Sequence, residues 1–395
     1  MACCLLVLPL AVRANAITLS DSCPAGFELT RGQCKLRSLY QLYPSLEDAG
    51  VGGLKTGLPA YRDGFSPQQI DLGRYLFFDP VLSADGSVSC ASCHQPERGF
   101  ADGLGRSLGA SGEPLRRSAP SLWNVAFQQR LFWDARASSL EEQMTGPLYD
   151  QHEMATSPEQ LLATLNGIPQ YRELFSQAWP QDFQAPGAQI RLDHVYLAIA
   201  AFEASLISLN SRYDQYAHGY ADALTGPEKE GLNVFRSFVA RCAECHTPPL
   251  FTNQQIAVIG TPEPEGLPFD AGASEPLGEP TLRGGFKVPS LRNIELTAPY
   301  MHSGRFATLR EAAAFYTGGR GHAVPEGENL KIHWHIWEPN LSDEELDRLV
   351  DFLATLTDES FKPRVPAELP SGMQPVHNEF ARQGVPPEDG APIDE

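Results

Sequence analysis

The sequence has little basic charge and no long apolar segment. It contains 30 Lys and Arg residues against 49 Asp and Glu residues, which gives a formal net charge of −19. Nucleic acids and anionic membrane surfaces attract basic proteins, so this excess of acid predicts no nucleic-acid partner. Apart from a short stretch near the N-terminus, no segment approaches the ~20 consecutive apolar residues that cross a bilayer. We therefore expect no membrane span in the mature protein.

The short apolar stretch has the features of an export signal. Residues 5–12 are apolar, and Ala14-Asn15-Ala16 after them has the A-x-A form of a cleavage site. The basic residues that usually precede such a stretch are absent. We interpret residues 1–16 as a signal peptide, which predicts a periplasmic location.

The eight cysteines fall into groups with different roles. Cys3 and Cys4 belong to the predicted signal peptide and leave with it. Cys23 and Cys34 lie in a turn-rich N-terminal extension, residues 17–60. In an exported protein, two such cysteines favour a structural disulfide. The other four cysteines occur as two pairs.

Each of these two pairs is part of a Cys-x-x-Cys-His motif, at residues 90–94 and 242–246. In this motif two thiols attach covalently to a haem, and the adjacent imidazole becomes an iron ligand. The alternative for a single motif is a zinc or redox Cys pair. A zinc site would group its four ligands, whereas these motifs lie 152 residues apart. The sequence therefore predicts two covalent c-type haems, held by six residues: Cys90, Cys93, His94, Cys242, Cys245 and His246.

The rest of the chain indicates mainly helices, separated by long loops rich in proline and glycine. Ser66-Pro67 has the form of a helix start ahead of an apolar-periodic run that reaches Phe78. Residues 194–209 are almost continuously apolar, which predicts a long buried helix between two halves of the molecule. Pro, Glu and Gly dominate the C-terminus, so residues 366–395 are predicted to form a disordered acidic tail.

The two halves of the chain resemble each other. Residues 120–142 align without a gap with residues 289–311, at an offset of 169, and both segments begin with Pro-Ser-Leu-x-Asn. Each copy follows one haem motif. We therefore predict a mainly α fold of two cytochrome c-like haem domains related by internal duplication, at residues 61–215 and 216–365.

The same offset compares the chemistry of the two halves. It pairs Trp133 with His302, and Pro147 with Tyr316. Proline has no side-chain donor for iron, whereas tyrosine has one. If this position lies over the haem, the first haem is open and the second is closed.

The chain strongly resembles the bacterial di-haem cytochrome c peroxidase and MauG superfamily, over roughly residues 66–356. The resemblance is carried by Leu-Phe-Phe-Asp-Pro at 76–80, Phe-Trp-Asp-x-Arg at 132–136, Leu-Arg-Asn at 291–293 and Leu-Thr-Ala-Pro-Tyr at 296–300. It implies that the first haem reacts with hydrogen peroxide, and that the second haem stores or relays an electron.

Two features of the sequence resemble the MauG-like branch of this superfamily. Ordinary peroxidases place a Met over the second haem, whereas the matching residue here is Tyr316, an oxygen donor that favours oxidised iron. Many of them also carry a His after the first motif that caps the resting iron. No His occurs between Gln95 and Trp123. The resemblance therefore implies a first haem that is open without reductive activation.

The resemblance also implies roles for individual side chains. Trp133 matches the tryptophan between the two haems, and His302 matches a group near the second haem that is not its ligand. Cleavage of peroxide requires a group that moves a proton and a polar group that stabilises the separating charge. The family's distal set matches Glu153 as the acid–base group, Gln143 as its support, and Pro147.

The sequence does not decide whether the protein binds calcium, or what role an aromatic cluster near the C-terminus has. The family holds calcium between the haems with an Asn side chain and backbone carbonyls; Thr297 and Pro299 fit, but the Asn position is Ser118. The cluster of residues 333–337 (His-Trp-His-Ile-Trp) is consistent with a metal site, an electron path or an ordinary packed loop.

These features predict a periplasmic di-haem c-type peroxidase. In the first hypothesis it uses hydrogen peroxide to reach a high-valent di-haem state and oxidises a protein partner, with Trp or Tyr modification as the MauG-like chemistry. The alternative is a cytochrome c peroxidase that reduces peroxide to water with electrons from a small cytochrome c or cupredoxin. A plain di-haem electron carrier is disfavoured, because fast electron transfer favours two fixed ligands on each iron.

Overall fold

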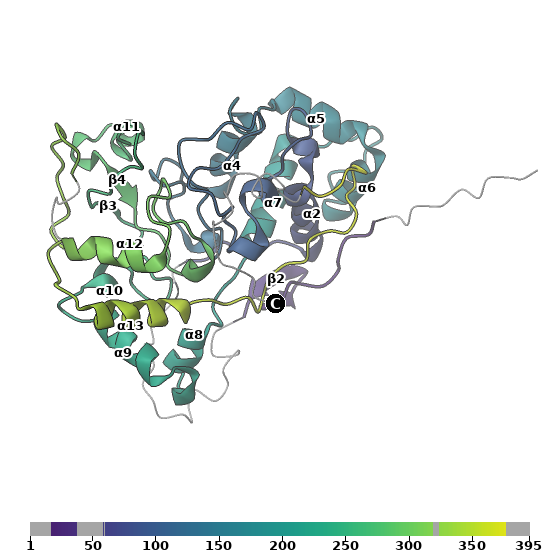
Figure 1. Cartoon of the computed structure of the whole chain (residues 1–395). Coiled ribbons are helices and arrows are strands. Elements are labelled where there is room, and N and C mark those ends of the chain that lie inside the picture. Colours follow the sequence, from purple (N-terminus) through teal and green to yellow (C-terminus); the bar gives the residue numbers. More distant parts are fainter. Residues whose placement is uncertain (1–16, 38–57, 59, 319–323, 377–395) are drawn as a thin grey trace, which may run out of the picture.

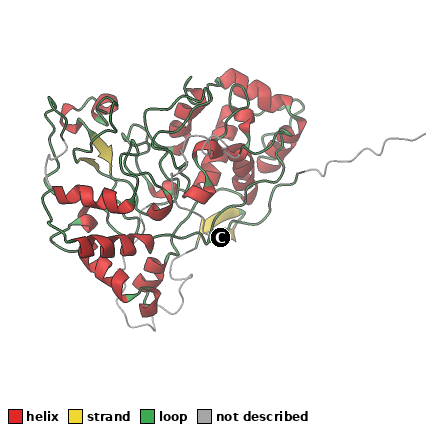
Figure 2. Ribbon diagram, in the orientation of Figure 1, coloured by secondary structure: helices red, strands yellow, loops and turns green. Residues whose placement is uncertain are grey.

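The computed structural model describes residues 17–37, 58, 60–318 and 324–376, and this part of the chain is mainly helical (Figures 1 and 2). It contains two small antiparallel sheets. In one, β1 (Phe27–Thr30) pairs with β2 (Gln33–Leu36); in the other, β3 (Ile256–Val258) pairs with β4 (Gly285–Lys287). The predicted mainly α fold class is confirmed.

The first half of the molecule is built around one helix pair. Its helices are α2 (Pro67–Phe78), α3 (Cys90–Cys93), α4 (Leu140–Tyr149), α5 (Pro158–Gly167), α6 (Pro169–Ala178) and α7 (Leu192–Ala204). The Ser66 side chain caps α2 by accepting from the backbone N–H of Gln69. Helix α2 then packs along α7, whose side chains are almost all buried.

Helix α7 is shorter than the predicted helix at residues 194–209, because its last turn is replaced by other hydrogen bonds. The Ser205 hydroxyl donates to the Phe202 carbonyl, and the chain then continues without regular secondary structure. The side-chain amide of Asn124 bonds both the N–H and the carbonyl of Ser208, at 3.0 and 2.8 Å. These bonds satisfy a buried backbone without a helix.

The second half repeats the arrangement of the first. Its helices are α8 (Arg212–Ala217), α9 (Gly226–Phe235), α10 (Cys242–Cys245), α11 (Ser274–Leu277), α12 (Leu309–Phe315) and α13 (Asp343–Ala354). The pair α9 and α13 takes the place of α2 and α7, and lies at the opposite side of the molecule (Figure 1). Tyr213 of α8 already packs in the second core. The predicted boundary between the halves at residue 215 stays a prediction.

The internal duplication is visible in the backbone. Helices α4 and α12 begin at residues 169 positions apart, and each is capped by a side-chain hydroxyl. Asn124 and Asn293, also 169 apart, both have the left-handed backbone conformation, with φ of 60° and 58°. Short bridges between residues 131 and 137 and between 300 and 306 occupy equivalent positions as well. The alignment of the two halves thus extends to their turns.

The ends of the chain differ in part from the predictions. The disulfide between Cys23 and Cys34 is confirmed. The predicted tail is not loose at its start: Leu369 is buried against the first half, and the Ser371 hydroxyl donates to Asp79 at 2.8 Å. This segment therefore returns to the first half (Figure 1). The predicted signal peptide and the tail beyond residue 376 lie outside the described residues. No helix in the described ranges is long and apolar enough to cross a membrane.

Two glycines allow the central helix pairs to approach closely. A Cβ atom on Gly73 would lie 1.8 Å from the carbonyl oxygen of Ala198, and one on Gly231 would lie 1.8 Å from that of Arg348. Both contacts involve backbone atoms, which cannot move aside as a side chain can. Any larger residue must push the two helices apart.

We therefore expect Gly73→Ala to lower the free energy of unfolding by about 2–3 kcal/mol, the usual effect of overpacking. Urea unfolding of the haem-loaded protein, followed by circular dichroism, measures this. Gly167→Ala at the end of α5 is the matched control, since no atom lies within 4 Å of its added Cβ. It should leave stability unchanged or raise it by up to ~1 kcal/mol. Equal unfolding midpoints for the two variants would contradict the packing argument.

Candidate functional site

A cavity of about 1130 Å³ lies between the two halves and reaches both Cys-x-x-Cys-His motifs. Cys93 and His94 line it from the first half, and Cys242, Cys245 and His246 line it from the second. None of the four motif cysteines forms a disulfide, so all four are available for haem attachment. The duplicated fold has therefore brought two motifs that are far apart in the sequence onto one enclosed space.

Each motif forms a single helical turn that aims its histidine at this space. The His94 N–H bonds the Cys90 carbonyl at 2.9 Å, and the His246 N–H bonds the Cys242 carbonyl at 2.8 Å. The ring Nδ1 of His94 donates to the Phe100 carbonyl at 2.8 Å, and that of His246 to the Phe251 carbonyl at 3.1 Å. This leaves the Nε2 of each ring for a ligand.

The residues at both motifs fit a covalent haem. Burial lowers the pKa of both His94 and His246, so that their rings are neutral and able to ligate iron. The backbone carbonyls that receive Nδ1–H fix the ring orientation, as is usual for metal-bound histidine. Two free thiols stand within one turn of each ring. The donor sets and the cavity thus accommodate two haems.

The predicted distal residues of the first haem meet on one wall of the cavity. Gln143 and Pro147 are four residues apart on α4 and so share a face of the helix, and both line the cavity. Glu153 follows in the turn after α4, where its N–H bonds the Asp150 carbonyl at 3.0 Å. Burial raises the pKa of Glu153, and the nearby Asp150 raises it further. A carboxyl group tuned toward neutral pH suits proton transfer.

Tyr316 lies directly after α12 and lines the part of the cavity near the second motif. Burial raises its pKa well above the usual value for tyrosine, and the thiols of Cys242 and Cys245 act in the same direction. Tyr316 occupies the position in the second half that Pro147 occupies in the first.

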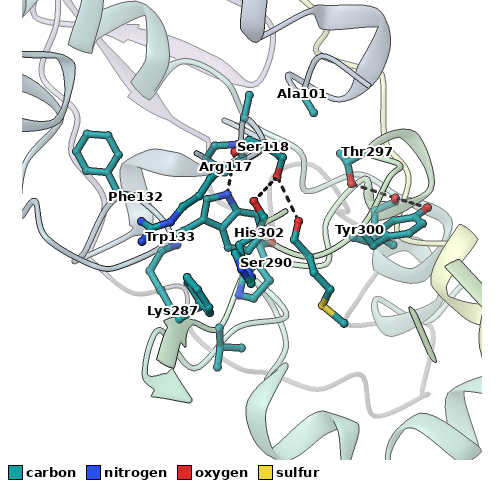
Figure 3. Close-up of a pocket in the computed structure, with 18 of the residues that line it drawn as sticks. Ala101, Arg117, Ser118, Phe132, Trp133, Lys287, Ser290, Thr297, Tyr300 and His302 are labelled. Carbon is teal, nitrogen blue, oxygen red and sulfur yellow. Dashed lines mark hydrogen bonds between the residues drawn. The ribbon is translucent and has the colours of Figure 1, made fainter. Parts of the chain in front are cut away.

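Trp133 and His302 both line the cavity, and Figure 3 shows them close to each other. The indole N–H of Trp133 donates to the Ser118 carbonyl at 2.9 Å. The ring of His302 stacks on Phe286 with centroids 3.8 Å apart, and its Nε2 is 2.8 Å from Glu263 Oε1. Because this nitrogen already has a carboxylate partner, the geometry favours a supporting role for His302 over iron ligation.

The three residues predicted to bind calcium line the same cavity. The Ser118 hydroxyl donates a bifurcated hydrogen bond to the carbonyls of Met301 and His302, at 3.2 and 3.3 Å. The Thr297 hydroxyl donates to a carbonyl of its own turn at 3.1 Å, and Pro299 contributes only a backbone oxygen. Calcium at Ser118, Thr297 and Pro299 stays a prediction.

The aromatic cluster at residues 333–337 packs beside the second motif. The Trp337 ring lies 4.0 Å from the Arg241 guanidinium, and His335 pairs with Glu244 at 2.8 Å. Trp334 is 63% exposed. Among the described residues, no group of three or more His, Cys, Asp or Glu side chains is arranged to hold a metal ion. The metal interpretation of this cluster therefore gains no support.

Two features of the cavity wall were missed at the level of sequence. Arg117 is buried between Asp134 and Asp270, at 2.6 and 2.7 Å, and so links the two halves by charge. The match at residues 132–136 could have drawn attention to Asp134, but nothing in the sequence connects it to Asp270. Glu203 of α7 also lines the cavity, and burial raises its pKa to about 8.

The fold and the two motifs define a di-haem c-type cytochrome with an enclosed site between its halves. A family profile described as di-haem cytochrome c peroxidase matches residues 67–222. The cytochrome c551 peroxidase of Nitrosomonas europaea is 34% identical over 302 residues, which cover 76% of this chain and 83% of that protein. The methylamine utilization protein MauG of Methylorubrum extorquens is 36% identical over 291 residues, covering 74% and 78%. The chain belongs to the di-haem cytochrome c peroxidase and MauG family.

Solved structures agree with this assignment. A MauG-like protein associated with microbial copper homeostasis superposes with a TM-score of 0.71 and 34% identity, over 79% of this chain and 97% of that one. The di-haem peroxidase BthA of Burkholderia thailandensis superposes with a TM-score of 0.66 and 28% identity, over 80% and 91%. The protein is therefore a haem-dependent oxidoreductase that acts on hydrogen peroxide and carries two c-type haems. Overall identity does not separate MauG from the peroxidases.

Proposed function

We propose that this protein is a MauG-like enzyme that uses hydrogen peroxide to oxidise a protein partner, with Trp or Tyr side chains of that partner as the targets. The observation that carries the proposal is the asymmetry between Pro147 and Tyr316 at equivalent positions of the duplicated cavity. A proline leaves the first iron open to peroxide. A tyrosine oxygen over the second iron favours its oxidised states over the ferrous state.

The side chains around the first motif supply the acid–base chemistry. Haem at this motif supplies the redox-active iron at which the O–O bond of peroxide is cleaved. Glu153 takes the proton from the inner peroxide oxygen and returns it to the outer one, which leaves as water. Gln143 donates a hydrogen bond to the charge that separates during cleavage. Pro147 keeps the position free of a competing ligand.

Trp133 is the electron relay between the halves in this proposal. Its indole comes from the first half, and its backbone carbonyl accepts a hydrogen bond from the N–H of Lys287 in the second half at 2.8 Å. An aromatic side chain held from both sides provides a fixed path for an electron. His302 supports the same region through its contact with Glu263.

The second candidate function is a cytochrome c peroxidase that reduces peroxide to water with electrons from a small cytochrome c or cupredoxin. Its support is the 34% identity to the Nitrosomonas peroxidase, which extends over most of both chains. Both functions take place in the periplasm in our proposal, and both use a redox protein as partner or substrate. They differ in what the oxidised enzyme takes electrons from: Trp or Tyr side chains of a protein substrate in the first, and a small cytochrome c or cupredoxin in the second.

Low-temperature electron paramagnetic resonance of the resting ferric protein tests the proposal. We expect one high-spin signal from an open first haem and one low-spin signal from a second haem with His and Tyr ligands. Tyr316→Phe should abolish the second signal and leave the first unchanged. Tyr220→Phe is the control, since Tyr220 is 45% exposed and does not line the cavity. Two low-spin signals in the unmodified protein would contradict an open first haem.

A further inference from the structure

Lys287 is a cation in the wall of the cavity. It is the last residue of β4, beside Trp133, whose carbonyl accepts its backbone N–H (Figure 3). Two residues further on, the Pro289 carbonyl receives the Nδ1–H of His246 at 3.2 Å. The backbone of this segment thus contacts both the relay tryptophan and the second haem motif, and the Lys287 side chain lines the cavity. Burial lowers the pKa of its ammonium group to about 8.

The charge of Lys287 has no anionic partner in the described part of the chain. The polar contact of its Nζ is the side-chain oxygen of Gln128, which is neutral. Arg117 lies in the same cavity wall but differs from Lys287, because its guanidinium contacts two aspartates. Lys287 is only half-buried by its surface exposure and faces the cavity, so its charge is partly desolvated without an anion beside it. An anion held in the cavity would pair with this ammonium group.

We infer that Lys287 and Gln128 form a carboxylate-binding site for a propionate group of haem. Each haem carries two propionates, and these are the anions that the family's cofactor brings into the cavity. The ammonium supplies the charge-assisted hydrogen bond, and the Gln128 side chain holds the ammonium in place. The carboxylate belongs either to the haem of the second motif, whose histidine is nearest in the chain, or to that of the first. The inference requires two bound haems, and assigning the carboxylate to one of them rests on the proposed contrast between a high-spin first haem and a low-spin second haem.

Such an ion pair tunes the haem as well as holding it. A positive charge near a haem disfavours the additional positive charge of ferric iron, so it raises the reduction potential. Removing the charge should lower the midpoint potential of the haem whose propionate it binds. The other haem should change much less, because the effect of a buried charge falls with distance.

Lys287→Met tests this, with Lys331→Gln as the control, since Lys331 is exposed and does not line the cavity. Spectroelectrochemical titration gives the two midpoint potentials separately, and resonance Raman spectroscopy follows the propionate bending modes. We expect Lys287→Met to lower one midpoint potential and shift one propionate mode, and the control to change neither. A shift at the low-spin haem assigns the carboxylate to the second motif, and a shift at the other haem assigns it to the first.

Lys287→Arg is the second test variant, for the case in which Lys287→Met does not incorporate both haems. The guanidinium retains the charge, so the potentials should stay near those of the unmodified protein. Its two parallel N–H donors should still change the frequency of the bound propionate mode. Unchanged potentials and propionate modes in a fully loaded Lys287→Met protein, or an unchanged mode in Lys287→Arg, would overturn the inference.

Discussion

Glu153→Gln should slow the reaction with hydrogen peroxide by about 10²–10⁴-fold, the usual contribution of a positioned general acid–base group. The amide keeps the shape of the side chain and removes its ability to exchange a proton. Stopped-flow mixing of the fully ferric protein with stoichiometric peroxide, followed in the Soret band, measures this step directly. The unmodified protein should react at once, without prior reduction, because no His is available between Gln95 and Trp123 to cap the first iron.

The pH dependence of the same reaction provides a control. Burial and Asp150 both raise the pKa of Glu153, so the rate should rise with pH through a value above that of an ordinary glutamate. Asp150→Asn removes one of these causes and should move the rise to lower pH without abolishing it. Glu153→Gln should abolish the rise. A Glu153→Gln protein that reacts at the unmodified rate would show that another group moves the proton.

Trp133→Phe should leave the reaction with peroxide intact and impair the later oxidation of the partner, the opposite of the effect of Glu153→Gln. We expect both resting ferric signals and the initial reaction with peroxide to be preserved, while oxidation of the protein partner falls to a small fraction. Phenylalanine fills most of the indole volume but gives up an electron far less readily. It also leaves the Ser118 carbonyl without its indole donor, which lowers stability by about 1 kcal/mol.

Trp179→Phe is the matched control for the relay. Trp179 stacks on Phe175 in the first half and does not line the cavity. The same substitution there should reduce packing but leave oxidation of the partner intact. A Trp133→Phe protein that oxidises its partner at the unmodified rate would return Trp133 to the role of a packing residue.

The equivalence of the two halves was predictable because it is encoded in short local segments. Pro-Ser-Leu-x-Asn specifies the same left-handed turn at Asn124 and Asn293, and a hydroxyl residue 15 positions later begins the same helix in each half. Turn and cap preferences depend on residues within one or two helical turns. Short-range features of the sequence also predicted the disulfide of the N-terminal hairpin, and the repeat made Pro147 and Tyr316 equivalent positions.

Predictions that reached beyond local preference were less successful. The apolar run at residues 194–209 indicated one long helix, but the helix ends at Ala204 and the amide of Asn124 bonds the backbone of Ser208 instead. The composition after residue 365 indicated a loose tail, but Leu369 is buried. In both cases a contact with a segment more than 80 residues away overrides what the local residues prefer.

The sequence by itself predicted the chemistry of attachment: two haems, the histidines proposed as their ligands, and the proposed contrast between an open first haem and a second haem with a tyrosine ligand. These features depend on residues that are adjacent in the chain or related by the repeat. Only the tertiary structure decided that both motifs share one cavity, that Arg117 joins the halves through Asp270, and that Lys287 faces this cavity with no acidic partner among the described residues. Burial and charge pairing arise from the packing of segments more than 100 residues apart, and no local pattern records them.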